Sequence, residues 1–275
     1  METIISMSRD SREDSSEEEP SPKYDKWKVI AASVRGLSHE KTGQPCQDAN
    51  EWKITSDGIL VAAVADGAGS AALGEVGSEI ASKIAVSSLC AEVEKGFEFN
   101  EENARQVLKA TLITVIEAVQ AEAETRQVEL RDLATTLILI IAHRNFAVAI
   151  QVGDGAAVIS DSEGQLHSLT VPSSGEYINE TTFVISPNAL ETAQIGLWQG
   201  AISQVAAFSD GLQMLALKIP EGTPHQPFFN PLFAFSGSAI EGVEANEKLA
   251  TFLNSPRIQE RADDDLTLLI ARVIE

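Results

Sequence analysis

The chain has few residues of the kinds that form disulfides or zinc sites. It contains 2 cysteines, Cys46 and Cys90, and 4 histidines among 275 residues. Two thiols in a chain of this length do not form the disulfide framework of a small secreted domain, so a reducing compartment is expected. Because histidine is scarce and no two cysteines stand at ligand spacing, a zinc site is disfavoured.

Basic residues are also scarce. There are 20 lysines and arginines against 41 aspartates and glutamates, which gives a formal net charge of −21. Such a chain is repelled at long range by nucleic acid and by anionic membranes, so neither is an expected partner. An acidic excess is common in soluble cytoplasmic proteins and does not by itself indicate a cation site. The placement of the acids has to decide that.

Long hydrophobic runs are absent. Runs such as Leu137 to Ala142 are far shorter than the roughly 20 residues that span a bilayer. Residues 1–25 lack the basic-then-apolar order of a signal peptide. We therefore expect a cytoplasmic protein, and the sequence indicates a monomer without a membrane anchor.

Residues 1–25 differ in composition from the remainder. They hold eight acids and three bases, with five serines between Ser6 and Ser16 and no apolar periodicity. Such a segment cannot bury enough apolar surface to offset its ordering entropy, so we predict a disordered acidic tail. Residues 26–275 are predicted to form one folded domain, since hydrophobic residues make up 44% of the chain.

The folded part alternates apolar runs with turn residues, and no fixed-period repeat is present. Eight strands are predicted, at 28–34, 59–65, 135–142, 146–151, 156–160, 165–170, 202–208 and 266–273. Helical periodicity marks residues 76–84 and 101–123, and shorter helices are expected near 210–217 and 243–253. Residues 36–45 are predicted as a loop and 171–200 as irregular, and turn spacing after 135 is typical of an antiparallel meander. This order favours an α+β fold, a β-sandwich covered by helices.

Several aspartates stand at the ends of apolar runs. Asp66, Asp154 and Asp210 each follow such a run, and the acids at 263–265 precede the last one. A rigid strand end holds a carboxylate at a rim that a cation can reach, and Mg²⁺ or Mn²⁺ prefers such oxygen ligands. Taken singly, Asp-Gly is an ordinary turn dipeptide, so only the set is informative.

Taken together, the motifs follow an order known from one family. They are Gln47-Asp48, Asp66-Gly-Ala-Gly69, Thr135-Thr136, Gly153-Asp154, Ser209-Asp-Gly-Leu212 and Asp264-Asp-Leu-Thr267. Over roughly residues 27–273 the chain resembles the PP2C-type (PPM) metal-dependent protein serine/threonine phosphatases. The resemblance implies a four-layer α-β-β-α sandwich, in which two antiparallel sheets are flanked by helix pairs.

The resemblance also implies a metal site. Two Mn²⁺ or Mg²⁺ ions are expected, with these ligands: Asp48, Asp66, the carbonyl of Gly67, Asp210 and Asp264. Asp66 would bridge both ions and is therefore assigned a catalytic role. Asp264 is chosen among three neighbouring acids because it stands three residues before Thr267, and Asp265 takes a place usually held by asparagine. Asp154 resembles the ligand of a weaker third ion, although Gly153-Asp-Gly-Ala156 departs from the usual Gly-Asp-Ser-Arg.

The implied reaction is hydrolysis of phosphoserine and phosphothreonine in proteins. A hydroxide activated by the two metal ions would attack phosphorus without a covalent enzyme intermediate. Phosphoprotein substrates and a signalling role follow from the same resemblance.

The first loop departs from the family pattern, which places an arginine shortly before the first aspartate to grip phosphate. Here His39 stands near that position and Arg35 just outside it, so both are predicted to contact the substrate phosphate. Protonated, His39 is also a suitable general acid; alternatively it is an ordinary surface histidine. Tyr177 and Asn179 fall in the family's variable flap and are further candidates for substrate contact, although a structural role is the more common one for such loop residues.

Three other functions remain open at this point. The chain resembles a catalytic enzyme, but the same fold also suits a pseudophosphatase that binds partners, or a hydrolase of small phosphoesters. A scaffold with incidental strand-end aspartates ranks last, because chance would have to reproduce several ordered motifs.

Overall fold

The computed structural model describes residues 26–172 and 181–274. The predicted tail at 1–25, and Tyr177 and Asn179 of the predicted flap, lie outside the described residues. Cys46 and Cys90 are free thiols, as expected. Within the described ranges, no helix combines the length and the apolarity needed to cross a bilayer.

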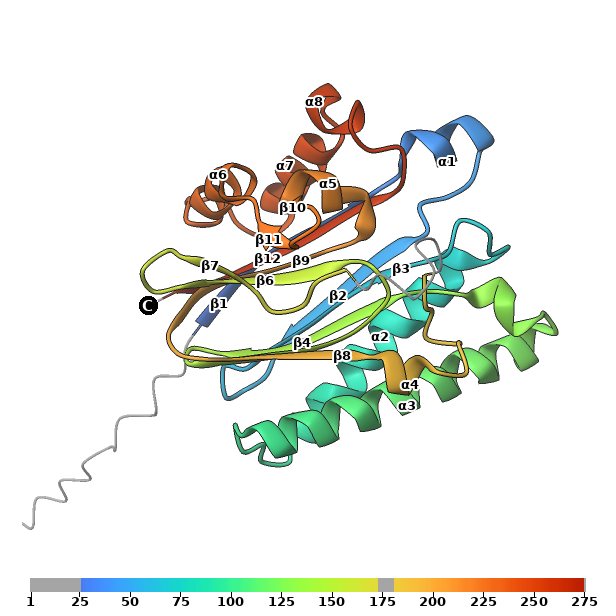
Figure 1. The fold of residues 1–275 in the computed structure, drawn as a ribbon, viewed down its shortest axis with the longest axis horizontal. Helices are drawn as coiled ribbons and strands as arrows, with labels where there is room; N and C mark the ends of the chain where they lie inside the picture. Colours follow the sequence, from blue (N-terminus) through green and yellow to red (C-terminus); the bar gives the residue numbers. More distant parts are fainter. Residues whose placement is uncertain (1–25, 173–180, 275) are drawn as a thin grey trace, which may run out of the picture.

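Two five-stranded antiparallel sheets form the centre of the fold (Figure 1). The first has the order β1 (Lys26–Val34), β12 (Leu266–Ile274), β9 (Ile202–Phe208), β6 (Ala156–Asp161), β7 (Leu166–Ser168). The second has the order β2 (Asp48–Ile54), β3 (Leu60–Asp66), β4 (Leu137–His143), β5 (Phe146–Val152), β8 (Gln194–Gln199). A small two-stranded pair joins β10 (Leu217–Lys218) to β11 (Thr223–Pro224).

Helices cover the outer face of each sheet (Figure 1). The second sheet is covered by α2 (Gly74–Val93) and α3 (Glu101–Arg126), and the first by α6 (Gln226–Ser236) and α7 (Gly242–Leu253). The short helices are α1 (Leu37–Thr42), η1 (Leu130–Leu133), α4 (Ala189–Thr192), η2 (Asp210–Leu212), α5 (Gln213–Ala216) and α8 (Pro256–Gln259). The predicted α+β, four-layer sandwich is confirmed.

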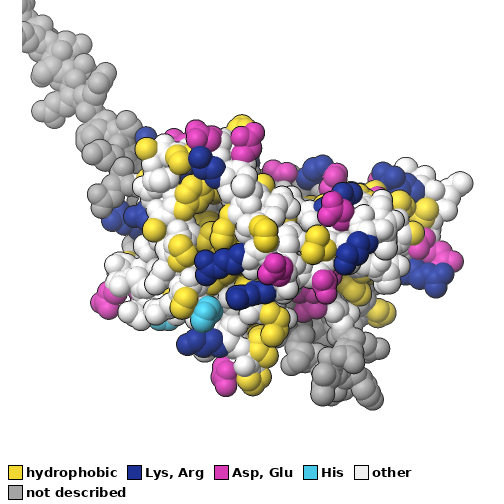
Figure 2. All heavy atoms as spheres, turned by 90° about the horizontal axis from the view of Figure 1, so that it is seen from above, with side chains coloured by type: hydrophobic (Ala, Val, Ile, Leu, Met, Phe, Trp, Pro, Cys, Tyr) yellow, Lys and Arg dark blue, Asp and Glu magenta, His cyan; other side chains and the backbone are white. Residues whose placement is uncertain are grey.

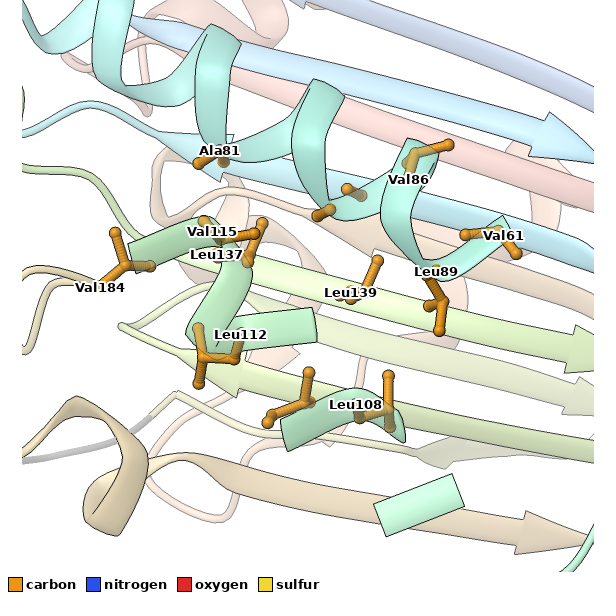
Figure 3. Packing of buried hydrophobic residues seen from close by; sticks show 14 of the residues in the cluster. Val61, Ala81, Val86, Leu89, Leu108, Leu112, Val115, Leu137, Leu139 and Val184 are labelled. Carbon is orange, nitrogen blue, oxygen red and sulfur yellow. The ribbon is translucent and has the colours of Figure 1, made fainter. Parts of the chain in front are cut away.

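Three apolar layers separate these four layers of secondary structure. In β3, Val61 and Ala63 pack against the α2/α3 pair (Figure 3), whereas Leu60 and Ala62 pack between the sheets. Successive side chains of a strand point to opposite faces, and both faces are covered here. This explains why β3 and β4 are apolar at nearly every position instead of alternating with polar residues.

The predicted meander is wrong at one point. The β4–β5 and β6–β7 hairpins form as expected, but β5 and β6 belong to different sheets. The chain crosses between the sheets at residues 153–155. Gly153 has φ +112°, and a Cβ there would lie 2.5 Å from Thr136 Cβ, so glycine is required for this crossing.

Several elements were not predicted: α1 lies within the predicted loop, β8 within the predicted irregular stretch, and β2 and α6 where no element was expected. The first is only six residues long, and β2 and β8 are edge strands of mixed polarity. Helix α6 contains Pro231 in its interior, which ordinarily argues against a helix.

Candidate metal centre

Five of the predicted ligands gather at one end of the sandwich. The β2/β3 register places Asp48 directly opposite Asp66. Asp210 follows β9, and Asp264 precedes β12, the strand that pairs with β9. Asp154 lies in the crossing between the two sheets. We refer to these five side chains as the carboxylate cluster.

The distances within the cluster are short. One carboxylate oxygen from each of Asp66, Asp154 and Asp210 lies within 4.8 Å of the other two. Asp264 is close enough for its negative charge to raise the pKa of both Asp66 and Asp210. Residues from four separate parts of the sequence are therefore held within reach of a common cation.

Burial favours the protonated form of two members of the cluster, Asp48 and Asp66. It raises the pKa of Asp48 to about 8, an effect to which the charge of Asp265 adds and which the hydrogen bond from Ser209 opposes. It also raises the pKa of Asp66 well above its usual range, and the charges of Asp48 and Asp210 act in the same direction. Without a cation, both carboxyl groups are therefore held preferentially in the neutral form.

Asp210 also has a raised pKa, and one of its carboxylate oxygens has no hydrogen-bond partner. Burial, followed by the charges of Asp154 and Asp264, raises its pKa to about 6. Its Oδ1 atom is buried and accepts no hydrogen bond from the described protein atoms. Among the described residues, no lysine, arginine or histidine forms an ion pair with any member of the cluster. A buried anion without a partner is costly, so the site calls for a cation.

The chemistry of the donors fits a hard divalent cation. The cluster offers only oxygen ligands, which Mg²⁺ and Mn²⁺ prefer. At Gly67, a Cβ would lie 2.3 Å from the Gly74 carbonyl oxygen, so only glycine fits beside the cluster. The residues present therefore fit the metal ions that the family resemblance implies.

Hydrogen bonds with neighbouring hydroxyl groups hold two of the aspartates. The Ser209 hydroxyl donates to Asp48 Oδ2 at 2.6 Å and accepts from the Thr267 backbone N–H at 3.0 Å. The backbone N–H of Asp66 donates to Thr136 Oγ1 at 3.1 Å. The aspartate motifs in the sequence contain these hydroxyl residues, but this supporting role was not predicted for them. The only signal for it was that each residue adjoins an aspartate motif or the start of a strand.

Asp154 has a hydrogen-bond partner at the start of the described residues 181–274. Thr181 Oγ1 donates to Asp154 Oδ2 at 2.8 Å. Thr181 belongs to the segment 176–183, which holds the predicted flap residues Tyr177 and Asn179, so the described end of this segment lies against the cluster. The contact joins the position predicted for a weaker third ion to a residue that the sequence had not singled out.

His39 is part of the same end of the molecule. It is 5% exposed, so the interpretation of His39 as an ordinary surface histidine is wrong. One of its ring nitrogens lies within 4.8 Å of carboxylate oxygens of Asp264 and Asp265. Its Nδ1 is 2.8 Å from Asp265 Oδ2.

Arg35, in contrast, lies on the outside of the first loop. Its side chain is 44% exposed and stands 3.9 Å from the Glu40 carboxylate. Its Nη1 donates a long hydrogen bond of 3.4 Å to the Gln44 carbonyl oxygen. The structure thus brings His39, and not Arg35, into contact with the residues around the cluster.

Comparison with known sequences identifies the family. A family model described as Protein phosphatase 2C matches residues 35–254. The chain belongs to the protein phosphatase 2C family. The matched range of this PP2C-family chain includes Asp48, Asp66, Asp154 and Asp210 and ends before Asp264. The pairing of β12 with β9 brings Asp264 to the same end of the sheet as Asp210.

Individual relatives agree with this assignment. Serine/threonine-protein phosphatase 3 of Escherichia coli (strain K12) is 35% identical over 252 residues, which are 89% of this chain and 98% of that protein. Among solved structures, a bacterial serine phosphatase superposes with a TM-score of 0.62 at 15% identity, over 90% of this chain and 97% of that one. The catalytic domain of the phosphatase PstP, in complex with 2 manganese ions, superposes with a TM-score of 0.57 at 18% identity, over 90% and 99%.

Proposed function

We propose that the chain is a metal-dependent phosphomonoesterase that removes phosphate from phosphoserine and phosphothreonine in proteins. The observation that carries this proposal is the carboxylate cluster. It has no basic partner among the described residues, and its Asp210 Oδ1 atom is buried and unpaired. The Escherichia coli relative is named a serine/threonine-protein phosphatase, which supports the substrate class.

We assign the ligands of two Mn²⁺ or Mg²⁺ ions to Asp48, Asp66, the carbonyl of Gly67, Asp210 and Asp264. Asp154 is assigned to a weaker third ion. The PstP structure with 2 manganese ions supports the number and the type of ion. When bound, such ions activate water as a nucleophile near neutral pH and neutralise charge on the phosphate oxygens.

The protein's own contribution is to hold this site in order. Ser209 orients Asp48, and the pairing of β3 with Thr136 fixes the backbone of Asp66. Asp66 ends the buried strand β3, and Asp48 starts the edge strand β2 that pairs with it, so regular sheet structure holds both ligands with little freedom. Because the pKa values of Asp48 and Asp66 are raised, loading of the site displaces protons from these carboxyl groups.

His39 is proposed to contact the substrate phosphate and to act as general acid. Its Nε2 lies 3.7 Å from the position that a Cβ on Gly69 would take, so the ring faces the turn that begins at Asp66. A protonated imidazole there can attract phosphate and supply a proton to the leaving oxygen. Arg35 is retained as a second phosphate contact, which requires it to leave Glu40 when substrate binds.

The test is Mn²⁺-dependent hydrolysis of para-nitrophenyl phosphate and of a phosphothreonine peptide. Wild type should be active on both, and Asp66→Ala should lose at least about 10³-fold, because charge stabilisation by the ions is worth several kcal/mol. Asp57→Ala is the matched control, since Asp57 is an exposed turn aspartate outside the cluster. Inactivity of wild type with metal present would leave a binding module as the function.

Peptide selectivity separates protein phosphatase from a hydrolase of small phosphoesters. The first loop departs from the family pattern and carries a buried His39, and this observation keeps the second function open. A kcat/KM that is higher for the phosphothreonine peptide than for small phosphoesters supports the protein substrate. The reverse order would favour the small phosphoester.

We further propose that the protein works as a cytoplasmic monomer in signalling, without nucleic-acid or membrane partners. The net charge of −21 supports this. On the face shown in Figure 2, basic side chains are interspersed with acidic ones instead of forming one continuous basic surface. Light scattering after gel filtration tests the monomer.

A further inference from the structure

One buried carboxylate near the metal centre has no assigned role. Asp265 is 2% exposed and accepts three N–H groups. Its Oδ1 accepts from the Gly36 backbone at 2.7 Å, and its Oδ2 accepts from the Gln47 backbone at 2.5 Å and from His39 Nδ1 at 2.8 Å. Its needs are therefore met within the protein, unlike those of the carboxylate cluster.

Two of these donors stand at the two ends of one loop. Gly36 precedes α1 and Gln47 precedes β2, so the single carboxylate of Asp265 holds together the two ends of the loop at 37–46. The backbone approaches closely here, because a Cβ on Gly36 would lie 2.2 Å from the Asp264 carbonyl oxygen. Ser38 N–H adds a bond to the Asp263 carbonyl oxygen at 2.9 Å. The loop is thus tied to the segment that carries the predicted ligand Asp264.

The third donor comes from inside the same loop and points back. His39 lies in the short helix α1 and is buried against Asp265. Because an ionised carboxylate can only accept a hydrogen bond, Nδ1 of His39 is the donor and carries a proton that points to Asp265. The opposite nitrogen, Nε2, faces Gly69 in the Asp66–Gly69 turn. The orientation of the ring is therefore set by Asp265.

We propose that Asp265 is a positioning residue, which aims Nε2 of His39 at the leaving oxygen of the phosphoester. This rests on the proposed function. As a hydroxide derived from water forms its bond to phosphorus, the bond from phosphorus to the seryl or threonyl oxygen breaks and the proton on Nε2 moves to that oxygen. The proton that the water released then returns the ring to its protonated form, so one water is consumed for each phosphate released. A carboxylate that orients an imidazole through its other nitrogen supports proton transfer without touching the substrate.

A purely structural role in closing the loop is the competing explanation. The two are separated by a double-mutant cycle with wild type, His39→Ala, Asp265→Ala and the double variant, assayed with Mn²⁺. Phenyl phosphate, which has a poor leaving group, needs the proton, whereas para-nitrophenyl phosphate needs it far less. Each single variant should lose about 10²-fold in kcat on phenyl phosphate and much less on para-nitrophenyl phosphate. The double variant should be no slower than His39→Ala.

Two outcomes would overturn the proposal. One is additive losses in the double variant, and the other is an equal loss on both substrates for Asp265→Ala. Because Asp265→Ala leaves three buried N–H groups without an acceptor, it can fail to fold. Asp265→Asn keeps one acceptor oxygen and serves as the second variant. It should show the same dependence on leaving group with a smaller loss.

A readout independent of turnover keeps this test apart from that of the proposed function. In ¹⁵N-histidine spectra, His39 is assigned by its loss in His39→Ala, and wild type should show a Nδ1-bound proton protected from exchange. That signal should disappear in Asp265→Ala or weaken in Asp265→Asn. If wild type is inactive while the signal behaves as expected, the proposed function fails and the orientation stands. An unchanged signal in both Asp265 variants would refute the positioning role.

Discussion

Two neighbouring sets of carboxylates in this molecule have different surroundings. Asp265 accepts three N–H groups and needs no further partner. The carboxylate cluster lies close to Asp265 in space but accepts few hydrogen bonds from the protein. Burial raises the pKa of Asp48, Asp66 and Asp210. One set holds the structure together, and the other is left to be completed by something that the protein does not supply.

This difference shows where the fold gives up stability for function. Replacing an unpaired buried charge with a neutral group relieves a cost, whereas removing a satisfied one exposes its donors. Substitution in the cluster and substitution at Asp265 should therefore affect the metal-free protein in opposite directions. Function and stability separate in the first set and move together in the second.

The largest expected effect is that of Asp210→Asn. Activity with Mn²⁺ should fall by about 10³-fold or more, because a ligand charge is lost. The metal-free variant should nevertheless melt at a higher temperature than wild type at pH 8, since the repulsion from Asp154 and Asp264 is relieved. Phosphatase assays and thermal melts measure the two effects.

Asp57→Asn is the control for that variant, because it neutralises an exposed turn aspartate. It should change neither activity nor melting temperature appreciably. If Asp210→Asn retained activity within tenfold of wild type, Asp210 would lose its assignment as a ligand, and the contrast between the two carboxylate sets would fail.

The parts of the site that were predictable from sequence are those set by strand logic. Asp66 and Asp210 end apolar runs that become β3 and β9, so their positions at sheet ends follow from local pattern. Asp154 follows the apolar run of β5 in the same way. The apolar runs themselves were easy to find because both faces of β3 and β4 are covered.

The parts that were not predictable depend on long-range pairing. Strand β2 has mixed polarity and was missed, so the register that sets Asp48 opposite Asp66 was not available. His39 and Asp265 are 226 residues apart in sequence, and no local pattern links them. Residues 36–45 were predicted as a loop because Gly36, Gly43 and Pro45 are typical loop residues, and the six-residue helix α1 that carries His39 is too short to show helical periodicity.

A smaller effect is expected at Ser209, which supports the cluster from outside. Ser209→Ala removes the hydrogen bond to Asp48 Oδ2 and the acceptor for the Thr267 N–H. Mn²⁺ affinity should fall by about 10- to 100-fold, as is typical when a partner that orients a ligand is lost. Isothermal titration calorimetry measures the change.

Ser203→Ala is the matched control, because Ser203 lies in β9, the strand that ends immediately before Ser209. Its hydroxyl donates to the Asp161 carbonyl oxygen at 2.8 Å, away from the cluster, so Mn²⁺ affinity should stay at the wild-type value. Equal losses in the two variants would mean that damage to the strand, and not the bond to Asp48, lowers the affinity.

The smallest and most graded effect is the pH dependence of stability. The pKa of Asp48 rises from 3.8 to about 8 on folding, and that of Asp210 from 3.8 to about 6. The folded metal-free protein therefore holds protons that the unfolded chain has released. The contribution of these bound protons to the free energy of unfolding is fully present below about pH 4. It is lost as the pH rises through the pKa values of the folded protein.

Denaturant unfolding from pH 5.5 to 8.5, with EDTA or with saturating Mn²⁺, measures this directly. The unfolding free energy of the metal-free protein should fall toward pH 8, while the stabilisation given by Mn²⁺ should grow, because the ion takes the place of the protons. In Asp48→Asn the fall between pH 6 and 8 should be reduced. Parallel curves with and without Mn²⁺ would show that the ion does not bind to these titrating carboxylates, and the cluster would then have no more need of a partner than Asp265 has.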